Sequence, residues 1–167
     1  MNYNNTTIRR QDRLLTEELA NKLLQSGEYG VLSMVDDNEN PYGIPINYVW
    51  DGQQSIYLHC APEGRKLNCL KTNSRVSFCI VGKTNILPEK FSTEYESIVL
   101  ECTSYIGLSS EERMNALMLL IEKYSPNLKE KGMKYAEGSF GRTEIIRLDI
   151  SDWSGKTKKI KNNNNMF

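Results

Sequence analysis

The chain has 167 residues, and its 21 Lys and Arg residues balance 21 Asp and Glu residues, so the formal net charge is zero. This length favours a single domain, and the neutral balance argues against the basic surface that nucleic-acid binding needs. No apolar run approaches the ~18–20 residues that cross a bilayer. The N-terminus also lacks the apolar region of a signal peptide, so we expect a cytoplasmic protein with neither nucleic acid nor a membrane as partner.

The cysteines are spread along the chain without a CxxC pair. In a reducing compartment this spacing predicts free and mostly buried thiols, not disulfides or a zinc site. We therefore expect no metal ion to be bound through them. The four residues are Cys60, Cys69, Cys79 and Cys102.

Both ends of the chain are polar and rich in asparagine, with MNYNNTT at the start and KIKNNNN near the end. Segments of this composition cannot bury enough apolar surface to fold. We therefore expect disordered tails at residues 1–8 and 157–167, on either side of one folded domain at residues 9–156.

The folded part begins with a helical pattern and then changes to alternation. Thr16 as N-cap, two glutamates in the first turn and Gly27 as a stop predict a helix over residues 16–26. Beyond Gly27, β-branched and aromatic runs separated by turn residues predict strands. These strands cover residues 29–35, 42–50, 54–60, 75–82, 95–108 and 143–151.

Two features of the second strand refine its place in the sheet. Asp51-Gly52 at its end predicts a hairpin to the third strand. Pro45 cannot donate to a ladder, so we expect an edge, a bulge or a place where the ladder is open.

The remaining segments predict helices and one loop. A helix is expected over residues 63–73, another begins at the capping box of Ser109 and Glu112, and a short one begins at Ser125-Pro126. Residues 83–90 are predicted to be a loop. Strands joined by tight turns favour antiparallel pairing, so the residues by themselves predict a mainly β fold, a small closed barrel with helices packed outside.

One segment, IYLHCAPEGRKLNCL at residues 56–70, carries the chemistry. Gly64 permits close backbone approach, and a helix that starts at Arg65-Lys66 would offer N–H groups and cations to a phosphate. An ordinary surface Arg-Lys pair remains the alternative.

His59 is the only histidine, and it is either a structural hydrogen-bonding residue or a catalytic one. No second histidine or cysteine pair supports a metal site, and GxGxxG, P-loop and GxSxG motifs are absent.

Six segments in order resemble the FMN-binding split-barrel proteins related to pyridoxamine 5'-phosphate oxidase, and within them the nitroimidazole-resistance (Nim) branch. The resemblance covers about residues 9–156. The segments are RRQDR (9–13), EYGVLSMVDDNENPYGIPINYVW (28–50), IYLHCAPEGRKL (56–67), SRVSFCIVG (74–82), LPEKFSTEYESIVL (87–100) and DWSGK (152–156).

This resemblance implies a six-stranded antiparallel split β-barrel that forms a homodimer, with FMN in the cleft between protomers. It implies that one strand passes the flavin ring with its backbone, that the end of the next strand lies beside the ring, and that the following turn holds the phosphate. A polar side chain of a later strand would also approach the ring. In that order, the implied residues are Pro45, Ile46, Asn47 and Tyr48; His59, Cys60 and Ala61; Gly64, Arg65 and Lys66; and Ser97.

The chain departs from the oxidase that gives the family its name. The second strand carries no Arg, and the last strand has Arg147-Leu148-Asp149-Ile150 without the proline of the oxidase pattern. These departures argue against vitamin B6 oxidation and favour a Nim-like FMN-dependent oxidoreductase. It would reduce a small planar acceptor such as a 5-nitroimidazole, with His59 as proton donor or substrate anchor. Since no dinucleotide motif is present, an external electron donor or loosely bound NAD(P)H is required.

Other functions stay open at this point. The chain could be a flavin or haem carrier or sensor without catalysis, since haem iron accepts histidine as an axial ligand. A pyridoxamine 5'-phosphate oxidase-like enzyme and a dimeric barrel that has lost its ligand are the remaining alternatives.

Overall fold

A computed structural model describes residues 1–160 of the chain. Its sheet contains β1 (Asn2–Tyr3), β2 (Tyr29–Val35), β3 (Pro41–Asn47), β4 (Val49–Trp50), β5 (Ser55–Cys60), β6 (Arg75–Leu87), β7 (Ser92–Tyr105) and β8 (Glu144–Lys158). The helices are α1 (Glu17–Ser26), α2 (Arg65–Thr72), α3 (Ser110–Tyr124) and α4 (Lys129–Ser139). Four 3-10 turns are η1 (Gln11–Arg13), η2 (Pro88–Lys90), η3 (Pro126–Leu128) and η4 (Phe140–Arg142).

The strands form one sheet in the order β3-β2-β6-β7-β8-β5-β4, with β1 beside β8. All neighbours are antiparallel except β1 and β8. The mainly β prediction is therefore confirmed, but there are eight strands and not six. The predicted strand at 42–50 is divided into β3 and β4 at Tyr48, and β1 is added. Within the described chain the hydrogen-bonded path does not close, so the closed barrel expected from the residues alone is wrong.

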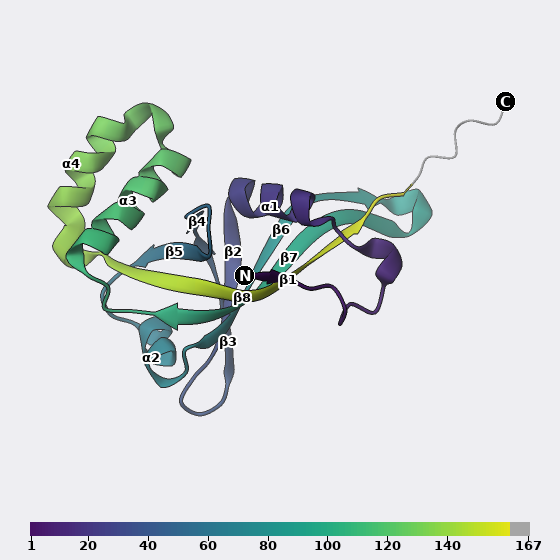
Figure 1. The fold of residues 1–167 in the computed structure, drawn as a ribbon, viewed down its shortest axis with the longest axis horizontal. Helices are drawn as coiled ribbons and strands as arrows, with labels where there is room; N and C mark the ends of the chain where they lie inside the picture. Colours follow the sequence, from purple (N-terminus) through teal and green to yellow (C-terminus); the bar gives the residue numbers. More distant parts are fainter. Residues whose placement is uncertain (161–167) are drawn as a thin grey trace.

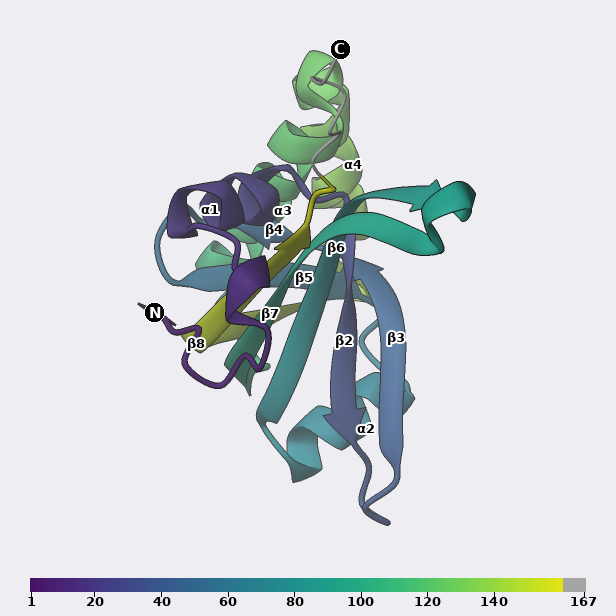
Figure 2. The same ribbon diagram turned by 90° about the vertical axis from the view of Figure 1, so that its right-hand side faces the viewer.

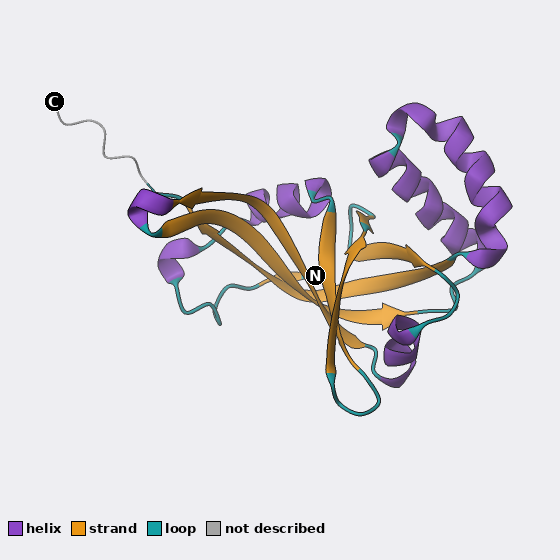
Figure 3. Cartoon of the chain, turned by 180° about the vertical axis from the view of Figure 1, so that it is seen from behind, coloured by secondary structure: helices purple, strands orange, loops and turns teal. Residues whose placement is uncertain are grey.

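The helices surround this sheet unevenly (Figures 1 and 2). The α3–α4 hairpin stands at one end of the molecule, and the β6–β7 hairpin projects at the other, as Figure 3 shows from behind. α1 lies near the middle, and α2 lies below the sheet beside β2. Among residues 1–160, no helix combines the length and the apolar character that crossing a membrane requires.

The helix starts follow the predicted caps. The Thr16 side chain accepts a hydrogen bond from the Leu19 N–H, and the Ser109 side chain accepts one from the Glu112 N–H. Each bond satisfies a first-turn N–H that has no partner within the helix. α1 and α3 therefore begin directly after the predicted cap residues.

The projecting β6–β7 hairpin corrects the loop predicted at residues 83–90. Beyond a register shift after Val81, the strands continue to pair from Thr84 with Tyr95 as far as Leu87 with Ser92. The residues here are mostly polar, and the apolar Ile86 and Leu87 are adjacent and do not alternate with polar ones, so their local pattern carries no strand period. Pairing across the hairpin determines the conformation instead.

The N-terminal segment also differs from its prediction. β1 pairs with Asp152 and Trp153 of β8, and the Tyr3 hydroxyl donates to the Leu15 carbonyl at 2.6 Å. The Tyr3 and Trp153 rings meet edge to face, with centroids 4.8 Å apart. The segment 1–8, expected to be a disordered tail, thus contains residues packed on the domain. At the other end β8 reaches Lys158, and residues 161–167 of the second predicted tail lie outside the described residues.

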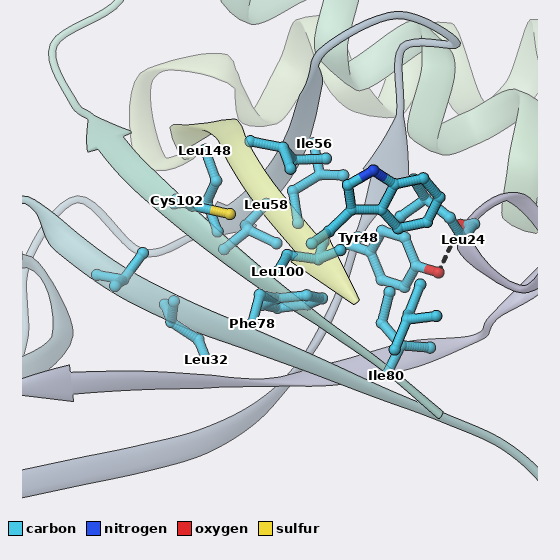
Figure 4. Close-up of a cluster of buried hydrophobic side chains, with 14 of the residues drawn as sticks. Leu24, Leu32, Tyr48, Ile56, Leu58, Phe78, Ile80, Leu100, Cys102 and Leu148 are labelled. Atoms are coloured by element: carbon cyan, nitrogen blue, oxygen red, sulfur yellow. Dashed lines mark hydrogen bonds between the residues drawn. The ribbon is translucent and has the colours of Figure 1, made fainter. Parts of the chain in front are cut away.

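The main core lies between the coiled sheet and α1 (Figure 4). Tyr48 is fully buried in it, edge to face with Phe78 at 5.3 Å, and its hydroxyl donates to the Leu24 carbonyl at 2.6 Å. A second cluster, which includes Ala116, Leu120 and Ala136, joins the α3–α4 hairpin to the sheet.

Candidate functional site

The turn between β5 and α2 has the backbone that the sequence predicted. Gly64 has φ = 131°, a conformation that side chains with a Cβ rarely adopt, and no atom lies within 4 Å of a Cβ placed there. The glycine is therefore needed for the backbone path and not for space. No side chain caps α2, so N–H groups of its first turn have no side-chain partner.

His59, Cys60 and Lys66 lie together where β5 meets α2. His59 is open to solvent on one side, yet desolvation and then the charge of Lys66 lower the pKa of its imidazole. Burial raises the pKa of the Cys60 thiol, and the nearby Lys66 opposes that rise. A neutral imidazole and an ammonium group thus adjoin each other, and Ala61 is exposed in the turn beside them.

Arg65 does not point into this group. Its guanidinium forms an ion pair with Asp36 (Nη2 to Oδ2, 3.0 Å) and lies 4.1 Å from the centroid of the Tyr42 ring. Hydrogen bonds from Asn40 and then from Arg65 lower the pKa of Asp36 despite some desolvation. Arg65 thus fastens the β2–β3 turn to α2. Lys66 is therefore the better placed of the two cations to hold an anion.

β3 lies at the edge of the sheet, as Pro45 predicted. Half of the backbone polar groups of an edge strand point away from the neighbouring strand. Pro45 and Asn47 are exposed, whereas Ile46 packs partly on the core. The Asn47 amide donates to the Glu28 carbonyl at 3.0 Å, which holds this side chain at the end of the strand.

Tyr48 is arranged differently from the residues before it. Its N–H donates to the Tyr124 hydroxyl at 3.1 Å, and its carbonyl accepts from Lys123 Nζ at 2.9 Å. Its side chain is in the core, so neither its ring nor these backbone groups are open to a flavin. Desolvation lowers the pKa of Lys123 to about 8. Lys123 and Tyr124 end an ordinary amphipathic helix, and nothing in their spacing predicted this contact.

A cavity of about 580 Å³ lies between the α3–α4 hairpin and the ends of β3 and β5. Asn47 and His59 form part of its wall on the sheet side, and leucine, isoleucine and tyrosine residues of the α3–α4 hairpin form half of the rest. Sequence reasoning missed this cavity, because its wall combines β3, β5 and the α3–α4 hairpin, which lie far apart in the chain.

Ser97 is not brought to His59 within one chain. Ser97 pairs with Lys156 of β8, whereas His59 pairs with Ile145, eleven residues away on the same strand. The structure therefore places His59, Cys60, Ala61, Gly64 and Lys66 together where β5 meets α2, and it brings His59 and Asn47 to one cavity. It leaves Ser97 in another part of the sheet.

The family model described as pyridoxamine 5'-phosphate oxidase matches residues 16–157. A comparison with curated protein sequences finds no match.

Several solved structures share the fold. A candidate 5-nitroimidazole antibiotic resistance protein from Bacteroides thetaiotaomicron is 17% identical, with a TM-score of 0.70 over 87% of this chain and 86% of that one. A conserved hypothetical protein from Mycobacterium tuberculosis is 15% identical, with a TM-score of 0.75 over 92% and 97% of the two chains. The FAD and haem binding protein from Mycobacterium smegmatis is 16% identical, with a TM-score of 0.73 over 90% and 75%.

These identities are too low to transfer more than the fold, which is the split barrel that the resemblance implied. The family model, in contrast, spans most of the chain and includes β2 to β7 with the β5–α2 turn. The chain therefore belongs to the pyridoxamine 5'-phosphate oxidase family.

Proposed function

We propose that this protein is a Nim-like, FMN-dependent oxidoreductase that reduces a small planar acceptor such as a nitroaromatic compound. The observation that carries the proposal is the grouping of His59 and Lys66 beside the uncapped start of α2 and the outer edge of β3. A redox cofactor supplies the chemistry in such a site, and the protein holds and orients it.

The residues fit FMN at both of its ends. Lys66 and the first N–H groups of α2 suit the dianionic phosphate, and the left-handed backbone at Gly64 leaves room for its approach. The unpaired backbone side of β3 suits the polar edge of the ring, next to Pro45 and Asn47. Tyr48, which the resemblance implied as a further contact, is not included, because α3 already engages its backbone.

When bound, a reduced flavin supplies two electrons, and with two protons these convert a nitro group to a nitroso group and one water. The task of His59 is to donate a hydrogen bond or a proton to the acceptor oxygen. Because its pKa is lowered, the imidazole is mostly neutral at neutral pH. Its contact with solvent allows it to be protonated again after each turnover.

Vitamin B6 oxidation is not favoured by the charges. Arg147, the arginine of the last strand, is held by Glu112 at 2.7 Å and by Asp149 at 2.8 Å. Its guanidinium also stacks on the Tyr105 ring. With these partners it is poorly placed to bind a substrate phosphate.

A homodimer with FMN between the protomers completes the proposal. Pro45, Val31, Cys79 and Val99 pair in one row across four strands, so their side chains share the outward face of the sheet. Ser97, two residues from Val99, lies on that same face. An exposed apolar surface of this kind is typical of an interface. In such a dimer, the flavin held near His59 of one chain would lie far from Ser97 of that chain. The partner subunit's Ser97 would approach it instead.

A charge on this face tests the dimer. Val99→Glu should convert a dimer to a monomer in sedimentation velocity, because it buries an unpaired carboxylate. Met118→Glu is the matched control, since Met118 is similarly exposed, at 46% against 40% for Val99, but lies on α3. An unchanged dimer in the Val99 variant would contradict the proposed interface.

The first test of the function is the absorption spectrum of the purified protein, with the released chromophore identified after heating. FMN should be released, and the photoreduced protein should reduce a 5-nitroimidazole without oxygen. A colourless protein that takes up no added FMN would contradict the redox function and leave the family assignment intact.

Haem binding is the second candidate. The neutral and accessible imidazole of His59 beside an apolar cavity favours it, since haem needs an axial ligand and an apolar surround. A Soret band that His59→Ala abolishes would select this function over flavin chemistry.

A further inference from the structure

The cavity under the α3–α4 hairpin is lined mainly by residues other than those expected to hold FMN. Lys66, Gly64, Pro45 and Ser97 are not among its lining residues. Only Asn47 and His59 are common to the cavity and to the cofactor group. The cavity therefore adjoins the cofactor region at Asn47 and His59.

The helices form a firm wall for this space. A Cβ at Gly132 of α4 would lie 2.7 Å from the Ile121 side chain of α3, so the two helices touch closely there. Leu117 and Leu120 of α3 and Ala136 of α4 are buried in the cluster behind the cavity. Such packing preserves the shape of the wall without a ligand.

The lining has a clear chemical character. A volume of about 580 Å³ is in the ~300–1,000 Å³ range of small-molecule sites, and most lining side chains are apolar or aromatic. Among residues 1–160, Lys131 is the single lining residue that carries a formal charge at neutral pH, and no carboxylate of this part of the chain lines the cavity. The cavity thus suits a neutral or anionic ligand and opposes a cationic one.

We propose that this cavity is the acceptor pocket: it binds a planar aromatic compound that carries an electron-accepting oxygen group and is neutral or anionic, with the oxygen towards His59. The inference rests on the proposed function, whose acceptor it describes. The aromatic ring packs against α3 and α4, and the negative end of the molecule lies on the side of Lys131.

Two exposed side chains lie at the rim of the pocket. Leu128 is 57% exposed and Tyr135 is 71% exposed, although both line the cavity. Large apolar side chains are seldom left in water without a role when they gather at a concave surface. In the pocket they would cover the outer face of a bound ring.

The test uses the full-length flavin-loaded protein and 4-nitrobenzoate as probe, with binding measured by calorimetry. Leu128→Ala should weaken probe binding about threefold to tenfold through lost apolar contact. Met118→Ala, on the exposed side of α3 and outside the cavity, is the control and should leave binding unchanged.

A charge reversal gives an independent measurement. Lys131→Glu should weaken 4-nitrobenzoate about tenfold and strengthen the cationic 4-nitrobenzylamine, whereas Lys134→Glu, which does not line the cavity, should alter neither by more than about twofold. Both positions are exposed on α4, so folding is not at risk.

The outcomes separate the pocket from the cofactor. If the Leu128 and Lys131 variants lose FMN in proportion to probe binding, the cavity holds the cofactor and the inference is overturned. If probe binding is unchanged in both variants while FMN content and nitro reduction are normal, the inference also fails and the proposed function stands. If no FMN binds to the wild-type protein, the proposed function fails, and probe binding to that flavin-free protein still decides whether the pocket exists.

Discussion

Two groups of charged residues lie beside β5, and they differ in how their charges are balanced. Arg147 forms ion pairs with Glu112 and Asp149, and each of these three side chains is about one quarter exposed. The Tyr57 hydroxyl also donates to Glu112. Lys66 has no carboxylate within ion-pair distance in the described part of the chain. Its neighbours are a histidine, a thiol and the start of a helix.

The difference separates a structural cluster from a binding one. Charges that satisfy one another hold elements in place, and here they join β8 to α3. A cation beside N–H groups without partners attracts an anion from outside. Substitutions in the Lys66 group should therefore alter flavin binding or catalysis, whereas a substitution in the Arg147 group should alter stability.

The largest effect is expected from His59→Ala. Loss of a positioned proton donor typically slows turnover about 10²- to 10⁴-fold. FMN content should stay near normal, because Lys66 and α2 hold the phosphate. Anaerobic stopped-flow of the photoreduced protein with a nitroimidazole measures the rate, and His59→Gln distinguishes hydrogen bonding from proton transfer. Equal rates in wild type and His59→Ala would assign His59 a structural role only.

Lys66→Ala should weaken FMN binding about 10- to 100-fold, because a charge-assisted bond to the phosphate is lost. Riboflavin, which has no phosphate, should bind equally to both proteins. Arg65→Ala, which removes the cation of the preceding residue, is the matched control. It should have a smaller effect on FMN, since Arg65 is engaged with Asp36. Fluorescence titration gives each of these affinities, and a larger loss of FMN affinity in the Arg65 variant would reverse the assignment.

The pH dependence should follow His59. Desolvation, and then the charge of Lys66, lower the pKa of His59, so its protonated form predominates only at pH values below that lowered pKa and is lost as the pH rises through it. If His59 donates a proton, the rate of nitro reduction should fall up to about tenfold per pH unit above its pKa. The His59→Gln variant should show no such slope. A rate that rises with pH in the wild type would exclude this role.

The smallest effect concerns the balanced group. Arg147→Met leaves Glu112 and Asp149 near each other without their shared cation, which should lower the free energy of unfolding by about 1–2 kcal/mol. FMN affinity should not change. Urea unfolding and flavin titration measure the two quantities, and a loss of flavin with unchanged stability would contradict the comparison.

The sequence predicted a large part of the fold and some of the site. Its strand and helix patterns located most elements, while β1, the break between β3 and β4 at Tyr48 and the outer part of the β6–β7 hairpin were missed. The segment from His59 to Lys66 was recognised from residue types and from the family resemblance, and the structure does gather most of it. Contacts with α3 were not predicted, because Tyr124 lies 76 residues beyond Tyr48 in the chain.

What the sequence determined by itself is local. Thr16 and Ser109 begin helices, Asp51-Gly52 turns a hairpin, and Gly64 adopts its left-handed backbone, because each depends on bonds or sterics within a few residues. Only the tertiary structure decided that Arg65 turns to Asp36, that α3 engages the Tyr48 backbone and that the α3–α4 hairpin encloses a cavity at His59. These arrangements depend on packing between distant segments, and no spacing along the chain records them.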